Sequence, residues 1–220
     1  MTNGSFRPLA HLAYLGLGLT AGMTVLGHVG ADSRLTAWGS TISDFAAVDF
    51  SGPVSIGIFL CVAASLALFA GLRRAAAPMG RWTKALLLTW CGGLAVTALV
   101  PTDNPFTLVE LSAAGWLHRV SASLAFVALI AATFTFAHGL RADEHWRDLT
   151  GRLRAMAAGA TVTGGLIVAS TYFGDRFLIG LAERTMAAFA VGALVVVAMR
   201  LLKLAERPVR LAAPRPALAF

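Results

Sequence analysis

Six long runs of apolar residues constrain this chain more than any other feature of its sequence. They cover about residues 8–27, 54–72, 83–101, 118–140, 155–173 and 180–202. A helix needs about 20 apolar residues to cross a bilayer core of about 30 Å, and each run reaches that length once its interfacial ends are included. Backbone groups in lipid must be hydrogen-bonded within the protein, so the runs predict helices. We therefore expect an all-α integral membrane protein, a bundle of six transmembrane helices.

Composition supports this fold class. Hydrophobic residues make up 57% of the 220 residues and charged residues only 13%, whereas a soluble domain is about 25% charged. The formal net charge of +7 does not indicate nucleic-acid binding, because the basic residues lie between the apolar runs. Residues 1–207 are predicted to form one transmembrane domain. The basic residues 208–220, rich in Pro and Ala, are predicted to form a disordered cytoplasmic tail.

The distribution of basic residues predicts the orientation. If the N-terminus is cytoplasmic, 14 of the 18 Lys and Arg residues fall on the inner side of the membrane. Positive residues accumulate in the cytoplasmic loops of membrane proteins. We therefore expect both termini inside, and a multi-pass protein of the bacterial cytoplasmic membrane.

The outer segments hold the residues with candidate chemistry. Ionisable groups at the edge of a bilayer are costly, and for that reason they are functional candidates. The candidate catalytic residues are Asp44, Asp103, His118 and Glu183. The candidate substrate-binding residues are Trp38, Phe45, Phe50, Glu110, Trp116, Tyr172 and Arg184.

Several candidates also have a purely structural interpretation. Asp103 lies in a proline-flanked turn and could cap the next helix. Asp44 could bond to the backbone of its own turn. If the fourth helix begins near Thr107, Glu110 and His118 lie roughly on one face of it, but His118 could simply be satisfied by a carboxylate or a carbonyl. The outer aromatic residues could form an interfacial belt.

These short motifs resemble the domain-of-unknown-function family 998. The resemblance rests on Ser43-Asp44, on the turn Pro101-Thr102-Asp103, on His118, and on Glu183-Arg184 at the start of the last helix. The family consists of small bacterial membrane proteins of roughly six helices and has no general assigned activity. The resemblance covers most of the chain. It implies the fold, and it implies that Asp44, Asp103, His118, Glu183 and Arg184 belong to one outer cluster.

The outer cluster favours an enzyme. A buried carboxylic acid has a raised pKa and can protonate an alkene or an epoxide, and aromatic rings can stabilise the resulting carbocation. We expect acid–base chemistry on a lipidic or isoprenoid substrate by an isomerase or lyase. In size and residue content the chain is similar to small bacterial integral-membrane terpene cyclases. The expected partners are membrane lipids and a hydrophobic small molecule, with no nucleic acid, cofactor or metal.

Three other functions remain open. A transporter or sensor could bind a cation or a lipid in the same outer vestibule. A metal-dependent lipid hydrolase could use His28 and His118 with one carboxylate, although no characteristic metal-binding spacing is present. A b-type haem protein could use those two residues together with His11 and His138.

Small residues within the apolar runs predict close helix packing. Gly18 and Gly22 form a GxxxG pattern, and Gly92–Gly93 and Gly164–Gly165 are adjacent pairs. Glycines let helix backbones approach each other in a membrane. Most are expected to pack within the bundle, and a glycine-rich helix face could also support a homo-oligomer.

Overall fold

The computed structural model describes residues 6–49, 52–107 and 110–206, and the regular structure in these ranges is helical. Six of the helices are long and apolar enough to cross a membrane. They are α1 (Arg7–Leu26), α3 (Pro53–Arg74), α4 (Arg81–Leu99), α5 (Ala113–Gly139), α6 (Thr150–Phe173) and α7 (Ile179–Glu206). The predicted six-helix membrane bundle is confirmed. The predicted tail at 208–220 lies outside the described residues.

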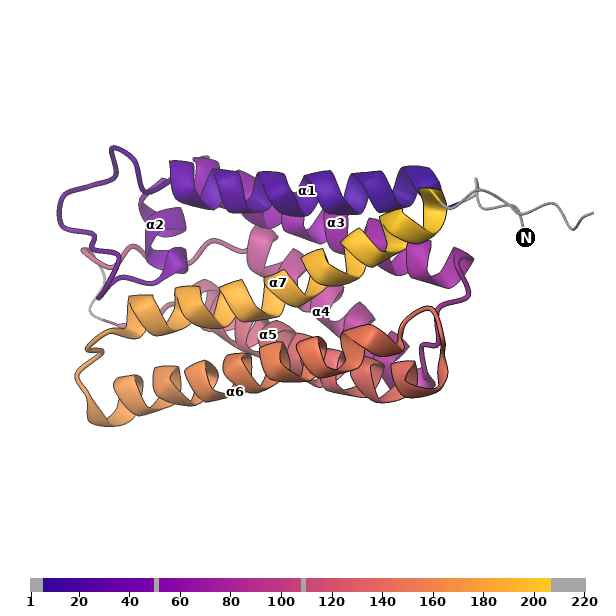
Figure 1. Cartoon of the computed structure of the whole chain (residues 1–220). Coiled ribbons are helices and arrows are strands. Elements are labelled where there is room, and N and C mark those ends of the chain that lie inside the picture. Colours follow the sequence, from indigo (N-terminus) through magenta and orange to yellow (C-terminus); the bar gives the residue numbers. More distant parts are fainter. Residues whose placement is uncertain (1–5, 50–51, 108–109, 207–220) are drawn as a thin grey trace, which may run out of the picture.

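The six helices form a closed ring. Each long helix packs against the next one in the chain, and α7 closes the ring by packing against α1. Successive helices run in opposite directions, so α1 begins and α7 ends at the same end of the bundle (Figure 1). We call this the basic end, because Arg73, Arg74, Arg81 and Arg152 lie there. We call the opposite end the cap end.

A short helix that the sequence analysis did not predict lies at the cap end. Helix α2 (Ile42–Val48) begins with a reciprocal capping box. The Asp44 backbone N–H donates to Thr41 Oγ1 at 3.1 Å, and the Thr41 N–H donates to Asp44 Oδ2 at 2.7 Å. Such a box satisfies two backbone donors that a helix start leaves free. The basic end has two short 3-10 helices instead, η2 (Leu140–Ala142) and η3 (Arg147–Leu149).

Local signals set the starts of two long helices. Helix α3 begins at Pro53, whose fixed φ suits the first position of a helix. Helix α5 begins after Ser112, whose hydroxyl accepts a hydrogen bond from the Gly115 N–H at 3.0 Å. The condition considered above, a start near Thr107, is therefore not met, and Glu110 lies outside the helix.

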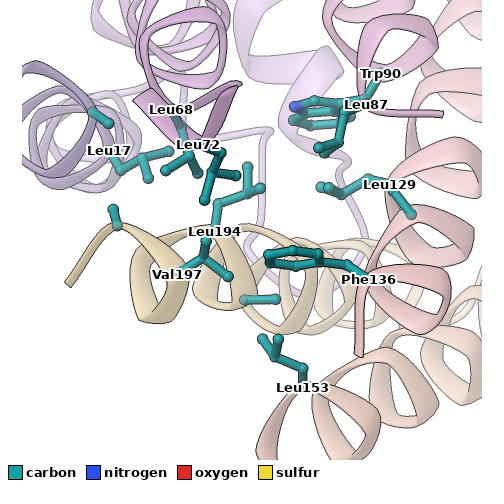
Figure 2. Packing of buried hydrophobic residues seen from close by; sticks show 14 of the residues in the cluster. Leu17, Leu68, Leu72, Leu87, Trp90, Leu129, Phe136, Leu153, Leu194 and Val197 are labelled. Carbon is teal, nitrogen blue, oxygen red and sulfur yellow. The ribbon is translucent and has the colours of Figure 1, made fainter. Parts of the chain in front are cut away.

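The centre of the bundle is a packed apolar core. Figure 2 shows Leu72 of α3, Trp90 of α4, Phe136 of α5 and Leu194 of α7 converging between the helices. Trp90 is 1% exposed, and its indole N–H donates to Ser65 Oγ at 3.0 Å. This bond satisfies the one polar group of the ring, so the tryptophan can be buried without an unpaired donor.

The glycines of the predicted packing motifs have different environments. A Cβ placed on Gly93 would lie 3.0 Å from the Ser121 carbonyl oxygen, so this glycine lets α4 approach α5 closely. A Cβ on Gly18, Gly22 or Gly92 would meet nothing within 4 Å. The GxxxG pattern of α1 therefore does not serve packing within the bundle, and a role in a homo-oligomer stays a prediction.

Candidate functional site

A serine and a histidine from distant parts of the chain meet at the cap end. His118 is 3% exposed. Its Nδ1 lies 2.8 Å from the Val100 carbonyl oxygen, and its Nε2 lies 3.2 Å from Ser43 Oγ. A carbonyl oxygen can only accept, so Nδ1 carries a proton, and in the neutral ring Nε2 can then accept the hydrogen of the serine hydroxyl. The imidazole is thus held with Nε2 directed at the serine.

Three separate helix ends supply these groups. Val100 follows the last residue of α4, where carbonyl oxygens lack partners within the helix. His118 lies in the second turn of α5, and Ser43 is the second residue of α2. The capping box at the start of α2 fixes the backbone that bears the serine. The site therefore depends on how α2 is seated over the ends of α4 and α5.

A small cavity adjoins His118. It measures about 250 Å³ counted to its mouth, which is below the 300–1,000 Å³ or so that is typical of ligand pockets. Its polar lining comes from Ser55, Thr97, Thr102 and His118, and the remaining lining residues are Ala46, Ile58, Ala98 and Val100. No charged side chain lines it. The cavity suits a small neutral group and not a lipid chain.

Glu183 bonds to the backbone of α2. Its Oε2 accepts a hydrogen bond of 2.6 Å from the Ile42 N–H, the first of the helix. Asp44 participates in the capping box, and its Oδ2 lies 3.7 Å from an Arg176 guanidinium nitrogen. Both carboxyl groups therefore help to fix α2 in place.

Arg184 fixes the segment before α2. Its Nη1 donates to the Ser40 carbonyl at 2.7 Å and to the Gly180 carbonyl at 2.9 Å. Its Nε and Nη2 lie 3.1 Å and 2.6 Å from His28 Nε2. A guanidinium only donates, so His28 accepts at Nε2, and its Nδ1–H donates to the Thr24 carbonyl at 2.6 Å.

The Phe45 ring lies beside His28 and Arg184. The side chain is 5% exposed. The ring centroids of His28 and Phe45 are 4.2 Å apart, and the Arg184 guanidinium carbon lies 5.2 Å from the Phe45 centroid. This geometry permits a cation–π attraction between Arg184 of α7 and Phe45 of α2, which strengthens the contact between the two helices.

Asp103 has the structural role that the sequence analysis considered for it. Its Oδ1 accepts a hydrogen bond of 2.6 Å from the Ser112 hydroxyl, and its Oδ2 accepts one of 2.9 Å from the Ser112 N–H. These bonds hold the pKa of the Asp103 carboxyl below its usual range. Asp103 is therefore a carboxylate that secures the start of α5, and it is poorly suited to donate a proton.

The other aromatic candidates do not gather around the cavity. The side chains of Trp38, Trp116 and Tyr172 are 61%, 60% and 75% exposed. Trp38 contributes through its backbone, whose carbonyl accepts from the N–H groups of Gly180 and Leu181 at 2.9 Å and 3.2 Å. Glu110 is exposed, and Phe50 lies outside the described residues.

From the sequence, Ser43 was predicted only as part of the loop motif Ser43-Asp44 and not as a nucleophile. The spacing of Thr41 and Asp44 matches a capping box, and that signal could have revealed α2. No local signal connects Ser43 with His118, since 75 residues separate them. Within the described ranges, no three His, Cys, Asp or Glu side chains are placed to bind one metal ion.

The comparisons with known proteins establish the family. The model of the family described as "Protein of unknown function (DUF998)" matches residues 14–200. The chain therefore belongs to this family, as the sequence motifs predicted. Comparison with curated proteins and with solved structures found no match.

Proposed function

Starting from membership of a family described without a function, we propose that this chain is a membrane-embedded enzyme that cleaves an acyl bond of a lipidic substrate by acid–base chemistry. Ser43 is the nucleophile and His118 is the base. The observation that supports this proposal is the 3.2 Å contact between Ser43 Oγ and His118 Nε2. It falls within the reach of about 2.6–3.2 Å expected for a nucleophile and its base.

The proposed reaction uses the two ring nitrogens of His118 for different tasks. As Ser43 Oγ attacks the acyl carbonyl carbon, Nε2 takes the hydroxyl proton and then gives it to the leaving alcohol. The Val100 carbonyl, 2.8 Å from Nδ1, keeps the ring in the required tautomer. In serine hydrolases a carboxylate has this orienting role. A carbonyl carries no full charge, so it stabilises the imidazolium less.

The position of the pair in the bundle supports a lipidic substrate. The site lies at the ends of the membrane-spanning helices α4 and α5, near the depth at which a lipid passes from chain to headgroup. We place the cap end on the outer face of a bacterial cytoplasmic membrane, because 14 of the 18 Lys and Arg residues then lie inside.

The isoprenoid cyclase is the narrower form of the acid–base hypothesis, and the geometry gives it less support. A cyclase needs a protonated acid and aromatic rings around a cation. Asp103 is held as a carboxylate, and Trp38, Trp116 and Tyr172 are mostly exposed. Cyclisation of a linear prenyl substrate remains one outcome of the substrate screen below.

Labelling with a serine-reactive probe tests the proposal. Purified protein in detergent is treated with a fluorophosphonate, and the modified residue is located by mass spectrometry. Hydrolysis of p-nitrophenyl butyrate is measured in parallel. We expect an adduct on Ser43 and no hydrolysis by Ser43→Ala. We expect His118→Gln to be slower by roughly 100-fold or more.

Ser33→Ala is the matched control, because Ser33 is an exposed serine in the loop before α2. This variant should keep wild-type activity. The proposal is wrong if Ser43 is not labelled, or if folded Ser43→Ala hydrolyses the ester at the wild-type rate. A cyclised prenyl product that forms equally well with Ser43→Ala would favour the cyclase.

A further inference from the structure

Two hydroxyl groups in the cavity beside His118 lack hydrogen-bond partners. Ser55 is 7% exposed, and its side chain lines the cavity together with Thr102. Within the described part of the chain, neither hydroxyl is hydrogen-bonded to another protein group. Buried polar groups are nearly always satisfied by protein atoms or by ordered water. An ordered water in this cavity would satisfy both the buried hydroxyl of Ser55 and the half-buried hydroxyl of Thr102.

We propose that Ser55 and Thr102 bind a water molecule beside His118, and that this water hydrolyses the acyl group on Ser43. The inference rests on the proposed function of Ser43 and His118. It adds that the enzyme is a hydrolase and does not pass the acyl group to a second lipid.

The size and chemistry of the cavity favour water over other ligands. The enclosed space suffices for about one water molecule, and a buried water needs two to four polar partners. Ser55 and Thr102 supply two, and His118 Nε2 becomes the third once Ser43 Oγ is acylated and no longer donates to it. Thr97 is already engaged, since its hydroxyl lies 2.9 Å from the Gly93 carbonyl and 3.1 Å from Ser121 Oγ.

The surrounding groups exclude a charged or a larger ligand. Ala46, Ile58 and Ala98 form apolar walls, and no charged side chain lines the cavity. A carboxylate or phosphate group would be buried there without a cationic partner, which is strongly unfavourable. Ala46 follows Ser43 by three residues in α2, so both lie on the same face of that helix. The cavity and the nucleophile are thus adjacent.

The proposed water completes a balanced second half of the reaction. The water oxygen attacks the carbonyl carbon of acyl-Ser43 while His118 Nε2 takes one water proton. The bond between the acyl carbon and Ser43 Oγ then breaks, and His118 returns the proton to Ser43 Oγ. The acyl group leaves as a carboxylic acid, and the free serine is restored.

Pre-steady-state kinetics with p-nitrophenyl butyrate test this role. The burst of p-nitrophenol reports acylation, the later linear rate reports deacylation, and the mass of acyl-Ser43 is followed over time. Ser55→Ala and Thr102→Val should keep the burst, while the linear rate falls by about ten-fold or more and acyl-Ser43 accumulates. Thr107→Val, an exposed threonine in the same turn, should behave like the wild type.

The outcomes separate the two proposals. If the wild type forms no acyl-Ser43, the proposed function fails. If the wild type forms it but both variants deacylate at the wild-type rate, the water site is wrong and the proposed function stands. Fluorophosphonate labelling of Ser43 identifies variants with an intact site. Thr102→Val, which lies outside the helices, provides the result if Ser55→Ala does not fold.

Discussion

The paired glycines of α4 offer a stability test in which most other effects cancel. Gly92 and Gly93 are neighbours inside the same helix, so replacement by Ala gains a similar helix propensity of about 1 kcal/mol at each position. A Cβ on Gly92 meets nothing within 4 Å. A Cβ on Gly93 would lie 3.0 Å from the Ser121 carbonyl oxygen and 3.1 Å from Ala125 Cβ.

The expected difference follows from these distances. Both neighbours of Gly93 belong to α5, and a helix backbone cannot move away as easily as the end of a side chain. Overpacking of this kind costs about 1–3 kcal/mol. We therefore expect Gly93→Ala to have a lower free energy of unfolding than Gly92→Ala by about 1–3 kcal/mol. For a protein of this size, each kcal/mol corresponds to about 2–4 °C in Tm.

Thermal unfolding in a mild detergent, followed by circular dichroism, measures this difference. The comparison is made between the two variants, because the helix-propensity gain then cancels whether or not helices persist in the unfolded state. Equal or higher stability of Gly93→Ala would refute the reasoning. It would mean that α4 and α5 separate at little cost, and that the bond between Val100 and His118 is not held by close helix packing.

Three further predictions concern the cap end. Glu183→Gln keeps an oxygen that can accept from the first N–H of α2, so it should retain activity, whereas Glu183→Ala should lose about 1–3 kcal/mol of stability together with activity; loss of activity in stably folded Glu183→Gln would instead indicate proton transfer by Glu183. Ser112 lowers the pKa of Asp103 from its ordinary value of 3.8. The ionised carboxylate therefore stabilises the fold above that pH, and this contribution is lost as the pH falls through the lowered pKa. Ser112→Ala should flatten the acid side of a plot of unfolding free energy against pH. A cysteine at Gly39 should react with a membrane-impermeant maleimide in whole cells, whereas one at Glu144 should stay protected; the reverse pattern would overturn the predicted orientation.

The transmembrane helices could be predicted because the bilayer fixes their length and their apolar character. The sequence predicted the ends of these helices less accurately than their existence. The fourth span was predicted to start at about residue 118, while α5 begins at Ala113 after the Ser112 cap. Hydropathy does not register such a cap, since it depends on a hydroxyl and on a carboxylate nine residues away.

Most residues of the candidate site were predicted from the sequence, but the roles of these residues were not. Asp44 lies in α2, and His118, Glu183 and Arg184 contact α2 or the segment before it. Whether a carboxyl group caps a helix or donates a proton depends on the groups that surround it in the fold. Glu183 accepts from the backbone N–H of Ile42, which is 141 residues away in the sequence. Periodicity and spacing within one sequence do not indicate such a contact.

The contacts of α2 show why charged residues occur at the edge of this bilayer-spanning bundle. Glu183 and Arg184 are neighbours, yet they bond to different segments. The Glu183 carboxyl group bonds to Ile42 of α2, and the Arg184 guanidinium bonds to Ser40 before α2 and to His28 after α1. Helix α2 is too short to be stable alone, so it depends on these contacts from α7 and on the packing of the His28 ring against Phe45. The base His118 is fixed separately, by α4 and α5. The distance between Ser43 and His118 is therefore set by how two groups of helices pack together, and residues that touch neither side chain can control it.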